Sequence, residues 1–164
     1  MWSVFARARS LCRAAPRRIL RAARGQGLVE FALVMPILMI LVFGIIDFGM
    51  GLRSYISLTN ATREGARFAA VGNPAGAYPA DCNGSTTNSV VGRVCVTIEG
   101  LRLADLETVT VEYPDGEAPG NSVVVSADYT YNYITPLGRL VDVFSGGTFP
   151  DSLSLSTSTD MRLE

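Results

Sequence analysis

The 164-residue chain contains no histidine and no lysine, and only one tryptophan. Without histidine it cannot form a Ser-His-Asp triad or use an imidazole as a general acid or base. It also lacks a P-loop, a G-x-G-x-x-G loop and a C-x-x-C pair. A metal site would have to consist of carboxylates, and these do not cluster in the sequence. We therefore expect a protein that is not an enzyme and that binds no metal or cofactor.

The positive charges are concentrated at the N-terminus. Residues 1–25 contain seven arginines and no acid, whereas the rest of the chain has seven arginines against fifteen acids, which leaves a net charge of −8. A basic block before an apolar run predicts a cytoplasmic N-terminus and an extracytoplasmic C-terminus. A nucleic-acid-binding arm is the alternative interpretation of this block. The block adjoins an apolar run and lacks interleaved aromatic residues, so we expect no nucleic-acid partner.

The longest apolar run extends from Leu28 to Ile46 and contains one charge, Glu30, and one helix breaker, Pro36. As a helix it would span about 28 Å, close to the hydrocarbon thickness of a bilayer. Its aliphatic and aromatic residues favour insertion by about 4 to 8 kcal/mol, which outweighs the cost of a glutamate near one end. The core is too long for a cleaved secretory signal. We therefore expect one membrane span, with Asp47 at its far boundary.

The helical pattern continues beyond the apolar run to Val71, where the sequence Gly72-Asn73-Pro74 is a stop signal. Ala61, Gly65 and Ala69 form a stripe of small residues that lets another backbone approach closely. The alternative is that alanine is present only because it favours helix. Glycine inside a helix costs about 1 kcal/mol relative to alanine and usually has a packing reason, so we favour a packing surface.

The C-terminal part predicts an α+β domain with a small antiparallel sheet. Alternating apolar residues indicate strands over residues 108–113, 123–133 and 153–163. Residues 72–89 are rich in glycine, proline, asparagine and serine and are expected to form a loop. Residues 90–103 fit either a helix or a strand, and we favour the helix. A short helix is expected over residues 137–144, ended by two glycines.

Two of the three cysteines lie in the part expected to be exported. Cys82 and Cys95 would be in a compartment where disulfides persist, whereas Cys12 lies on the other side of the span. A bridge between them would close a loop of about 14 residues and contribute roughly 3 kcal/mol. Two free thiols are the alternative, because the sequence cannot show that the two Cβ atoms meet. We predict the disulfide.

Two motifs resemble a known family. Gly25, followed after four residues by Glu30-Phe31 and the apolar run, resembles the cleavage motif of type IV-like prepilins. The sequence from the DFG at 47–49 to LTNATREGARFAA at 58–70 resembles the TadE family of pseudopilins from Flp/Tad pilus systems. The resemblance is close over residues 24–70 and covers the C-terminal domain only in outline. It implies a pilin-like α+β fold, in which a long N-terminal membrane-spanning helix packs on a small antiparallel sheet.

The resemblance also implies processing and partners. A prepilin peptidase would cut between Gly25 and Gln26, which makes Glu30 the fifth residue of the mature protein and Phe31 the sixth. Gly27 is a rival site, but it would place the glutamate third. The implied organisation is a basic cytoplasmic leader (1–25), a transmembrane helix that continues outside (26–71) and an exported domain (72–164). The implied partners are the membrane, the peptidase, other Tad pilins and pseudopilins, and the inner-membrane assembly platform.

Glu30 has a physical reason to take part in assembly. An unpaired carboxylate near lipid needs a cation, and the α-amine freed by cleavage would lie about one helical turn away. The alternative is an interfacial acid that complements the helix dipole. Pro36 removes the amide that would bond to the carbonyl of Ala32, so we expect the helix to bend or loosen there.

The expected assembly interface comprises Glu30, Pro36 and the small-residue stripe Ala61, Gly65 and Ala69. The protein would then act in Tad pilus assembly through helix–helix contacts. The alternative function is that of an exported binding domain held by an uncleaved signal anchor. The two differ in the N-terminus of the mature protein, which would be Gln26 in the first case and Met1 in the second.

Overall fold

A computed structural model describes residues 18–84, 87–98, 100–147 and 149–164. Residues 1–17, which make up most of the expected leader and include Cys12, lie outside the described residues. The chain divides into two compact units, Met1–Met39 and Ile40–Glu164. Helix α1, Arg18–Ala70, contributes to both units and begins eight residues before the expected boundary at Gln26.

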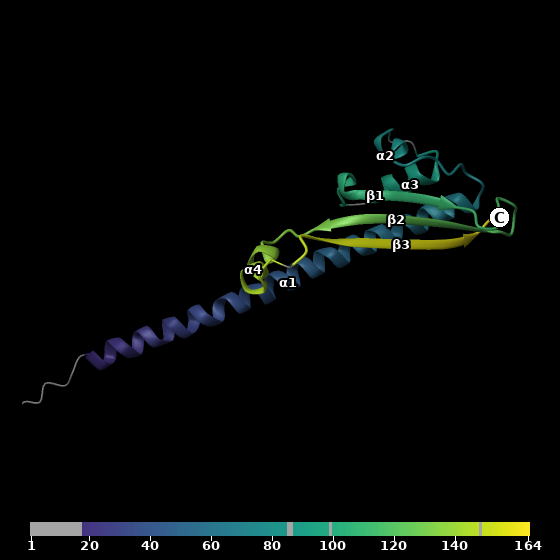
Figure 1. Ribbon diagram of the computed structural model, residues 1–164. Coiled ribbons are helices and arrows are strands. Elements are labelled where there is room, and N and C mark those ends of the chain that lie inside the picture. The colour runs from purple at the N-terminus through teal and green to yellow at the C-terminus, as the bar shows by residue number, and fades with distance from the viewer. Residues whose placement is uncertain (1–17, 85–86, 99, 148) are drawn as a thin grey trace, which may run out of the picture. The chain divides into compact units, whose positions relative to one another are not determined.

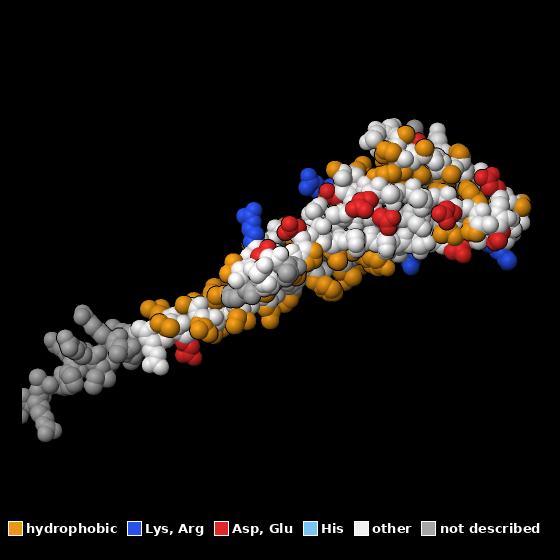
Figure 2. Space-filling model, viewed as in Figure 1, with side chains coloured by type: hydrophobic (Ala, Val, Ile, Leu, Met, Phe, Trp, Pro, Cys, Tyr) orange, Lys and Arg blue, Asp and Glu red, His pale blue; other side chains and the backbone are white. Residues whose placement is uncertain are grey.

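Helix α1 includes the whole predicted apolar run and continues through Pro36. Most of its large apolar side chains between Leu28 and Ile46 are exposed. Figure 2 shows apolar side chains gathered along this helix. Among the described helices, α1 is the one that is long and apolar enough to cross a membrane. The structure is thus consistent with a single-pass membrane protein.

The second unit contains a three-stranded antiparallel sheet in the order β1-β2-β3 (Figure 1). The strands are β1 (Leu106–Glu112), β2 (Ser122–Asn132) and β3 (Ser152–Arg162). Each lies within two residues of its predicted range. In β2, buried residues alternate with partly exposed ones, which is the pattern of a strand with one face on a core. The predicted α+β fold is confirmed.

Four short helical segments complete this unit: α2 (Ala80–Gly84), α3 (Val90–Thr97), η1 (Leu103–Asp105) and α4 (Leu137–Ser145). Helix α3 confirms the helical alternative for the first eight residues of the 90–103 segment. Ser89 caps it, because its hydroxyl accepts a hydrogen bond from the amide of Gly92 at 3.0 Å. Helix α4 ends at Gly146, which has a left-handed conformation with φ of 77°.

The prediction of a loop over residues 72–89 is wrong for α2. The composition of residues 72–89 indicates a loop, but specific side-chain contacts stabilise one short helix within this segment. The carboxylate of Asp81 accepts hydrogen bonds from the amide of Ala77 at 2.9 Å and the hydroxyl of Ser89 at 2.7 Å. Cys82 is bonded to Cys95 in α3. These contacts hold α2 against residues up to 13 positions away.

The core lies between the second half of α1, α3 and the inner face of the sheet. Leu58 of α1, Val94 of α3 and Val125 of β2 are fully buried there. Strand β3 runs beside α1 in the same direction, since Thr59 contacts Thr157 at 3.4 Å and Thr62 contacts Thr159 at 3.1 Å through their hydroxyls. The register of α1 on the sheet is therefore defined by polar contacts as well as by apolar packing.

Candidate functional site

The residues of the predicted processing site lie on the exposed surface of α1. Gly25, Gln26, Glu30 and Phe31 are all exposed. A Cβ atom added to Gly25 or to Gly27 would meet no other atom within 4 Å. Glycine inside a helix is unfavourable by about 1 kcal/mol relative to alanine. The packing of the described chain therefore gives no reason for glycine at either position.

Glu30 lies on one side of α1 together with Gln26, Val29 and Leu33. None of the side chains that the structure describes forms an ion pair with this carboxylate. A partner cation would thus come from outside the described side chains. Pro36 lies inside α1 two turns further on and is partly exposed.

The small-residue stripe packs against this chain itself. Ala61, Gly65 and Ala69 are buried. A Cβ atom added to Gly65 would lie under 3.0 Å from Cγ2 of Val94 and 3.5 Å from Cγ1 of Val125. The expected close approach is therefore made by α3 and β2, and the part of the assembly interface assigned to these three residues needs correction. Periodicity indicated a close contact but could not identify the contacting segment.

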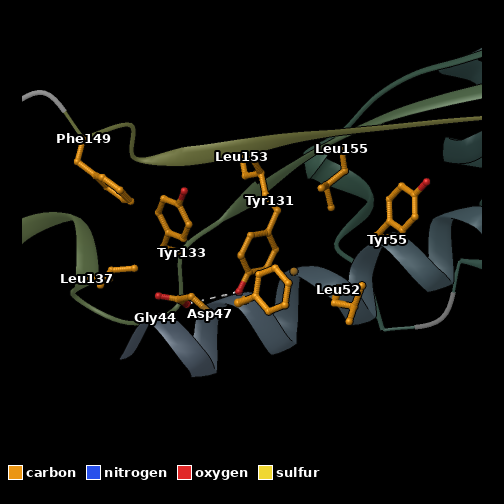
Figure 3. Close-up of a pocket in the computed structure, with 12 residues that line it drawn as sticks. Gly44, Asp47, Leu52, Tyr55, Tyr131, Tyr133, Leu137, Phe149, Leu153 and Leu155 are labelled. Atoms are coloured by element: carbon orange, nitrogen blue, oxygen red, sulfur yellow. Dashed lines mark hydrogen bonds between the residues drawn. The ribbon is translucent and has the colours of Figure 1, made fainter. Parts of the chain in front are cut away.

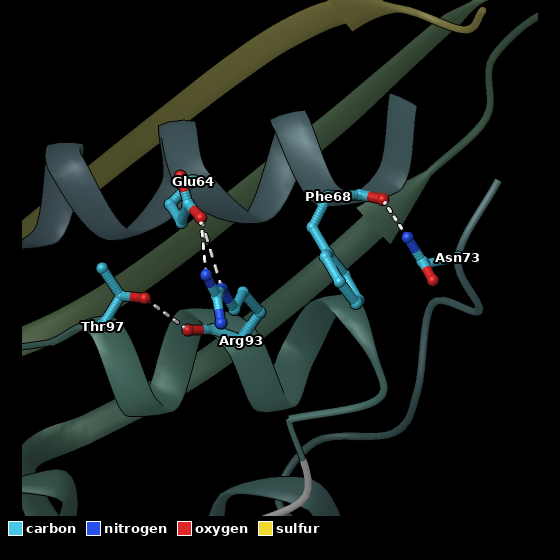
Figure 4. A network of polar contacts seen from close by, with 5 residues as sticks. All are labelled: Glu64, Phe68, Asn73, Arg93 and Thr97. Atoms are coloured by element: carbon cyan, nitrogen blue, oxygen red, sulfur yellow. Dashed lines mark hydrogen bonds and ion pairs between the residues drawn. The ribbon is translucent and has the colours of Figure 1, made fainter. Parts of the chain in front are cut away.

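An ion pair joins α1 and α3 beside this contact (Figure 4). Nη2 of Arg93 lies 2.9 Å from Oε1 of Glu64, and the guanidinium also lies 5.9 Å from the centre of the Phe68 ring. Asn73 then ties the chain after α1 to the carbonyl of Phe68 at 2.9 Å. Because both charged side chains are partly exposed, the pair contributes about 1 kcal/mol at most and mainly orients α3.

Asp47 forms the most extensive buried polar contact in the described chain (Figure 3). Its side chain is only 2% exposed. Oδ1 accepts hydrogen bonds from the amide of Ile134 at 2.9 Å, the amide of Thr135 at 3.3 Å and the hydroxyl of Tyr131 at 3.5 Å. Oδ2 accepts one from the Thr135 hydroxyl. The carboxylate thus holds the segment after β2 against α1.

The sequence identified Asp47 only as the far boundary of the apolar run. Its position gave one further signal, because a carboxylate next to such a run needs hydrogen-bond donors if the fold buries it. The donors come from residues more than 80 positions away, and two of them are backbone amides. No residue-type pattern marks backbone donors, so this contact could not have been predicted.

A cavity of 330 Å³ lies next to Asp47, between α1 and the ends of β2 and β3. Its lining is apolar apart from the carboxylate and three tyrosine hydroxyls: Gly44, Asp47, Phe48, Gly51, Leu52, Tyr55, Tyr131, Tyr133, Leu137, Phe149, Leu153 and Leu155. Burial, followed by the nearby Asp47 carboxylate, raises the pKa of Tyr131 above its usual value. The lining could accommodate an apolar group.

The predicted disulfide between Cys82 and Cys95 is present, and the two Cα atoms are 5.3 Å apart. It joins α2 to α3 in the second unit. Within residues 18–164, leaving out the undescribed positions, no three histidine, cysteine, aspartate or glutamate side chains are grouped so that they could hold a metal ion. The disulfide is therefore the covalent link that fixes the segment after α1.

Comparison with known proteins agrees with the resemblance seen in the sequence. A family model described as "TadE-like protein" matches residues 25–67. No curated protein and no solved structure matches the chain significantly. The matched residues include Gly25, Glu30 and Asp47, whereas the sheet lies outside the match. Residues 25–67, about a quarter of the chain, are thus similar to the TadE-like family.

Proposed function

We propose that this protein is a TadE-like minor pilin or pseudopilin, a membrane-anchored structural component of a Tad/Flp pilus assembly system. The observation that supports this function is the TadE-like match on residues 25–67, which contain the apolar run of α1. The protein would act through helix–helix contacts without catalysing a reaction. Its partners would be other Tad pilins and pseudopilins, and the inner-membrane assembly platform.

Processing by a prepilin peptidase is part of this proposal. The peptidase would cut after Gly25, on the cytoplasmic side of the span, and the domain after α1 would lie outside the cytoplasm. Support comes from the exposure of Gly25 and from the empty space around it. Since the packing of the described residues does not require this glycine, an external requirement for a small residue would account for it.

The N-terminus of protein isolated from its native membrane tests this function. Mass spectrometry should find a chain that begins at Gln26. The Gly25→Val variant should remain uncut, because a β-branched side chain does not suit a peptidase that requires a small residue. Gly27→Val is the matched control, since Gly27 is equally free of neighbours, and it should still be cut.

Three outcomes would contradict the proposed processing. Cleavage of Gly25→Val at the wild-type position would show that the peptidase does not read this glycine. A native chain that begins at Met1 would instead support an exported binding domain on an uncleaved anchor. Loss of cleavage in Gly27→Val alone would move the site to the rival glycine.

Glu30 is proposed to set the register of neighbouring helices after cleavage. When helices pack in lipid, its carboxylate loses access to water and must find a cation, which the new α-amine supplies. Glu30→Gln keeps the shape of the side chain but removes its charge. It should leave insertion intact and weaken association with partner pilins by about 1 to 3 kcal/mol.

Co-purification of Glu30→Gln with the partner pilins is the measurement, after cleavage has been confirmed. Glu64→Gln is the matched control, because it removes a carboxylate from the same helix at a residue that pairs with Arg93. The control should recover partners as the wild type does. Equal recovery with Glu30→Gln would show that Glu30 is only an interfacial acid.

A further inference from the structure

The start of α4 lies beside the last turn of the apolar run (Figure 3). Asp47, the first residue after this run, holds Ile134 and Thr135 just before α4. Leu137, the first residue of α4, lines the same cavity as Gly44, which lies within the run. Because a helix rises about 1.5 Å per residue, Gly44 and Asp47 differ by only about 4.5 Å along α1. A membrane that contains the run would therefore end close to α4.

Two aliphatic side chains of this region are exposed to an unusual degree. Val143 in α4 is 78% exposed, more than any other large apolar side chain that the structure describes. Ile134, next to the Asp47 contact, is 63% exposed. Removing such side chains from water is favourable, and the adjacent boundary of the bilayer offers an apolar environment.

The charge of this segment indicates what kind of membrane contact is possible. Residues 134–151 contain one basic residue, Arg139, and two acidic residues, Asp142 and Asp151. The segment therefore has no excess of basic residues that would attract anionic headgroups. A contact with lipid would depend on apolar burial, and it would form on zwitterionic lipid as well.

We infer that Ile134 and α4 insert into the membrane boundary at the Asp47 end of the apolar run. The inference rests on the proposed membrane insertion of residues 28–46. The exported domain would then have a second membrane contact beside its transmembrane helix, and α4 would lie in the interface as amphipathic helices do. The Asp47 contact would hold α4 at this depth.

Fluorescence quenching in phosphatidylcholine nanodiscs tests the inference. The full chain carries Cys12→Ser and one added cysteine labelled with an environment-sensitive dye, while the native disulfide stays oxidised. Val143→Cys is the test variant. Val71→Cys is the matched control, because Val71 is also an exposed valine, and it directly follows the end of α1, about 36 Å beyond Asp47. Ile37→Cys reports insertion of the apolar run.

A nitroxide on the lipid headgroup should quench the dye on Val143→Cys at least about twofold more than the dye on Val71→Cys, since an interfacial helix lies about 5–10 Å into the boundary. Adding anionic lipid should leave this ratio unchanged. Equal quenching of the two dyes would overturn the inference. Blue-shifted emission from Val143→Cys without quenching would also overturn it, because a protein surface, such as a second copy of the chain, would then cover α4.

The test separates this inference from the proposals on which it depends. An acyl-chain nitroxide that fails to quench Ile37→Cys would overturn the membrane span, and the inference with it. A native N-terminus at Met1 would contradict the processed pseudopilin, yet strong quenching of Val143→Cys would still support the membrane contact. The two results therefore identify which proposal has failed.

Discussion

Removing the Asp47 carboxylate should release the segment between β2 and α4 from α1. In Asp47→Ala, the amides of Ile134 and Thr135 and the Thr135 hydroxyl lose their acceptor. The rest of the core does not depend on this carboxylate, since its buried residues pack between α1, α3 and the sheet. We therefore expect local opening of this segment without unfolding of the sheet.

The size of the effect follows from the hydrogen bonds. A hydrogen bond to a charged group contributes about 1.5–3 kcal/mol. The two closest of the four come from the Ile134 amide and the Thr135 hydroxyl, so their loss costs about 3–6 kcal/mol. Relief of the desolvation of Asp47 and entry of water offset part of this loss. A net local effect of about 2–4 kcal/mol corresponds to about 30- to 1,000-fold faster amide exchange.

Hydrogen exchange of the full chain in detergent, read on peptides over residues 133–145, measures this effect. Amides in the middle of β2 report global stability and should exchange as in the wild type. Asp160→Ala is the matched control, because Asp160 is an exposed residue of β3. Exchange of Ile134 and Thr135 within about twofold of the wild type in Asp47→Ala would refute the role of the carboxylate, since it corresponds to under about 0.5 kcal/mol.

Two further predictions concern the core. Gly65→Ala should lower the free energy of unfolding by up to about 2 kcal/mol, because overpacking against Val94 outweighs the gain in helix propensity. Gly49→Ala, whose added Cβ meets no neighbour, should raise it by up to about 1 kcal/mol. Denaturant titration followed by circular dichroism compares the two variants, and a Gly65→Ala variant as stable as the wild type would contradict the close contact. Burial raises the pKa of Tyr131 above its usual value of 10.0, and it does the same for Tyr78, Tyr113 and Tyr129. As the pH rises above about 10, the unfolded chain therefore loses these protons before the folded chain does, and the free energy of unfolding should fall. Tyr131→Phe should weaken this dependence in the same titration, and an unchanged alkaline slope would count against the shift at that residue.

The secondary structure of the domain that follows α1 was largely predictable because its strands have one buried face. Alternation along β2 is regular over eleven residues, and the predicted strand differs from the observed one by a single residue at each end. The end of α1 was equally clear, since Gly72 has a positive φ of 78° and Pro74 follows. Local chemistry determines these features, and so the sequence alone reveals them.

Apart from the Cys82–Cys95 disulfide, contacts between distant residues were not predictable. Helix α2 also depends on Asp81, which accepts a hydrogen bond from Ser89 just before the next helix. The Asp47 contact depends on backbone amides that any residue type would provide. Periodicity shows that a surface is buried but not which segment buries it, and Gly65 is the clearest case.

The burial of the stripe changes where helix–helix contacts can form under the proposed function. Since α3 and β2 occupy the face with Gly65, a partner helix needs another face of α1. Phe48, Leu52 and Ile56 recur every four residues just beyond the apolar run, and all three are exposed. This spacing places them on one side of the helix. Under the proposed function, helix–helix contacts outside the lipid would therefore use this apolar face, and Glu30 would set the register at the other end of the span.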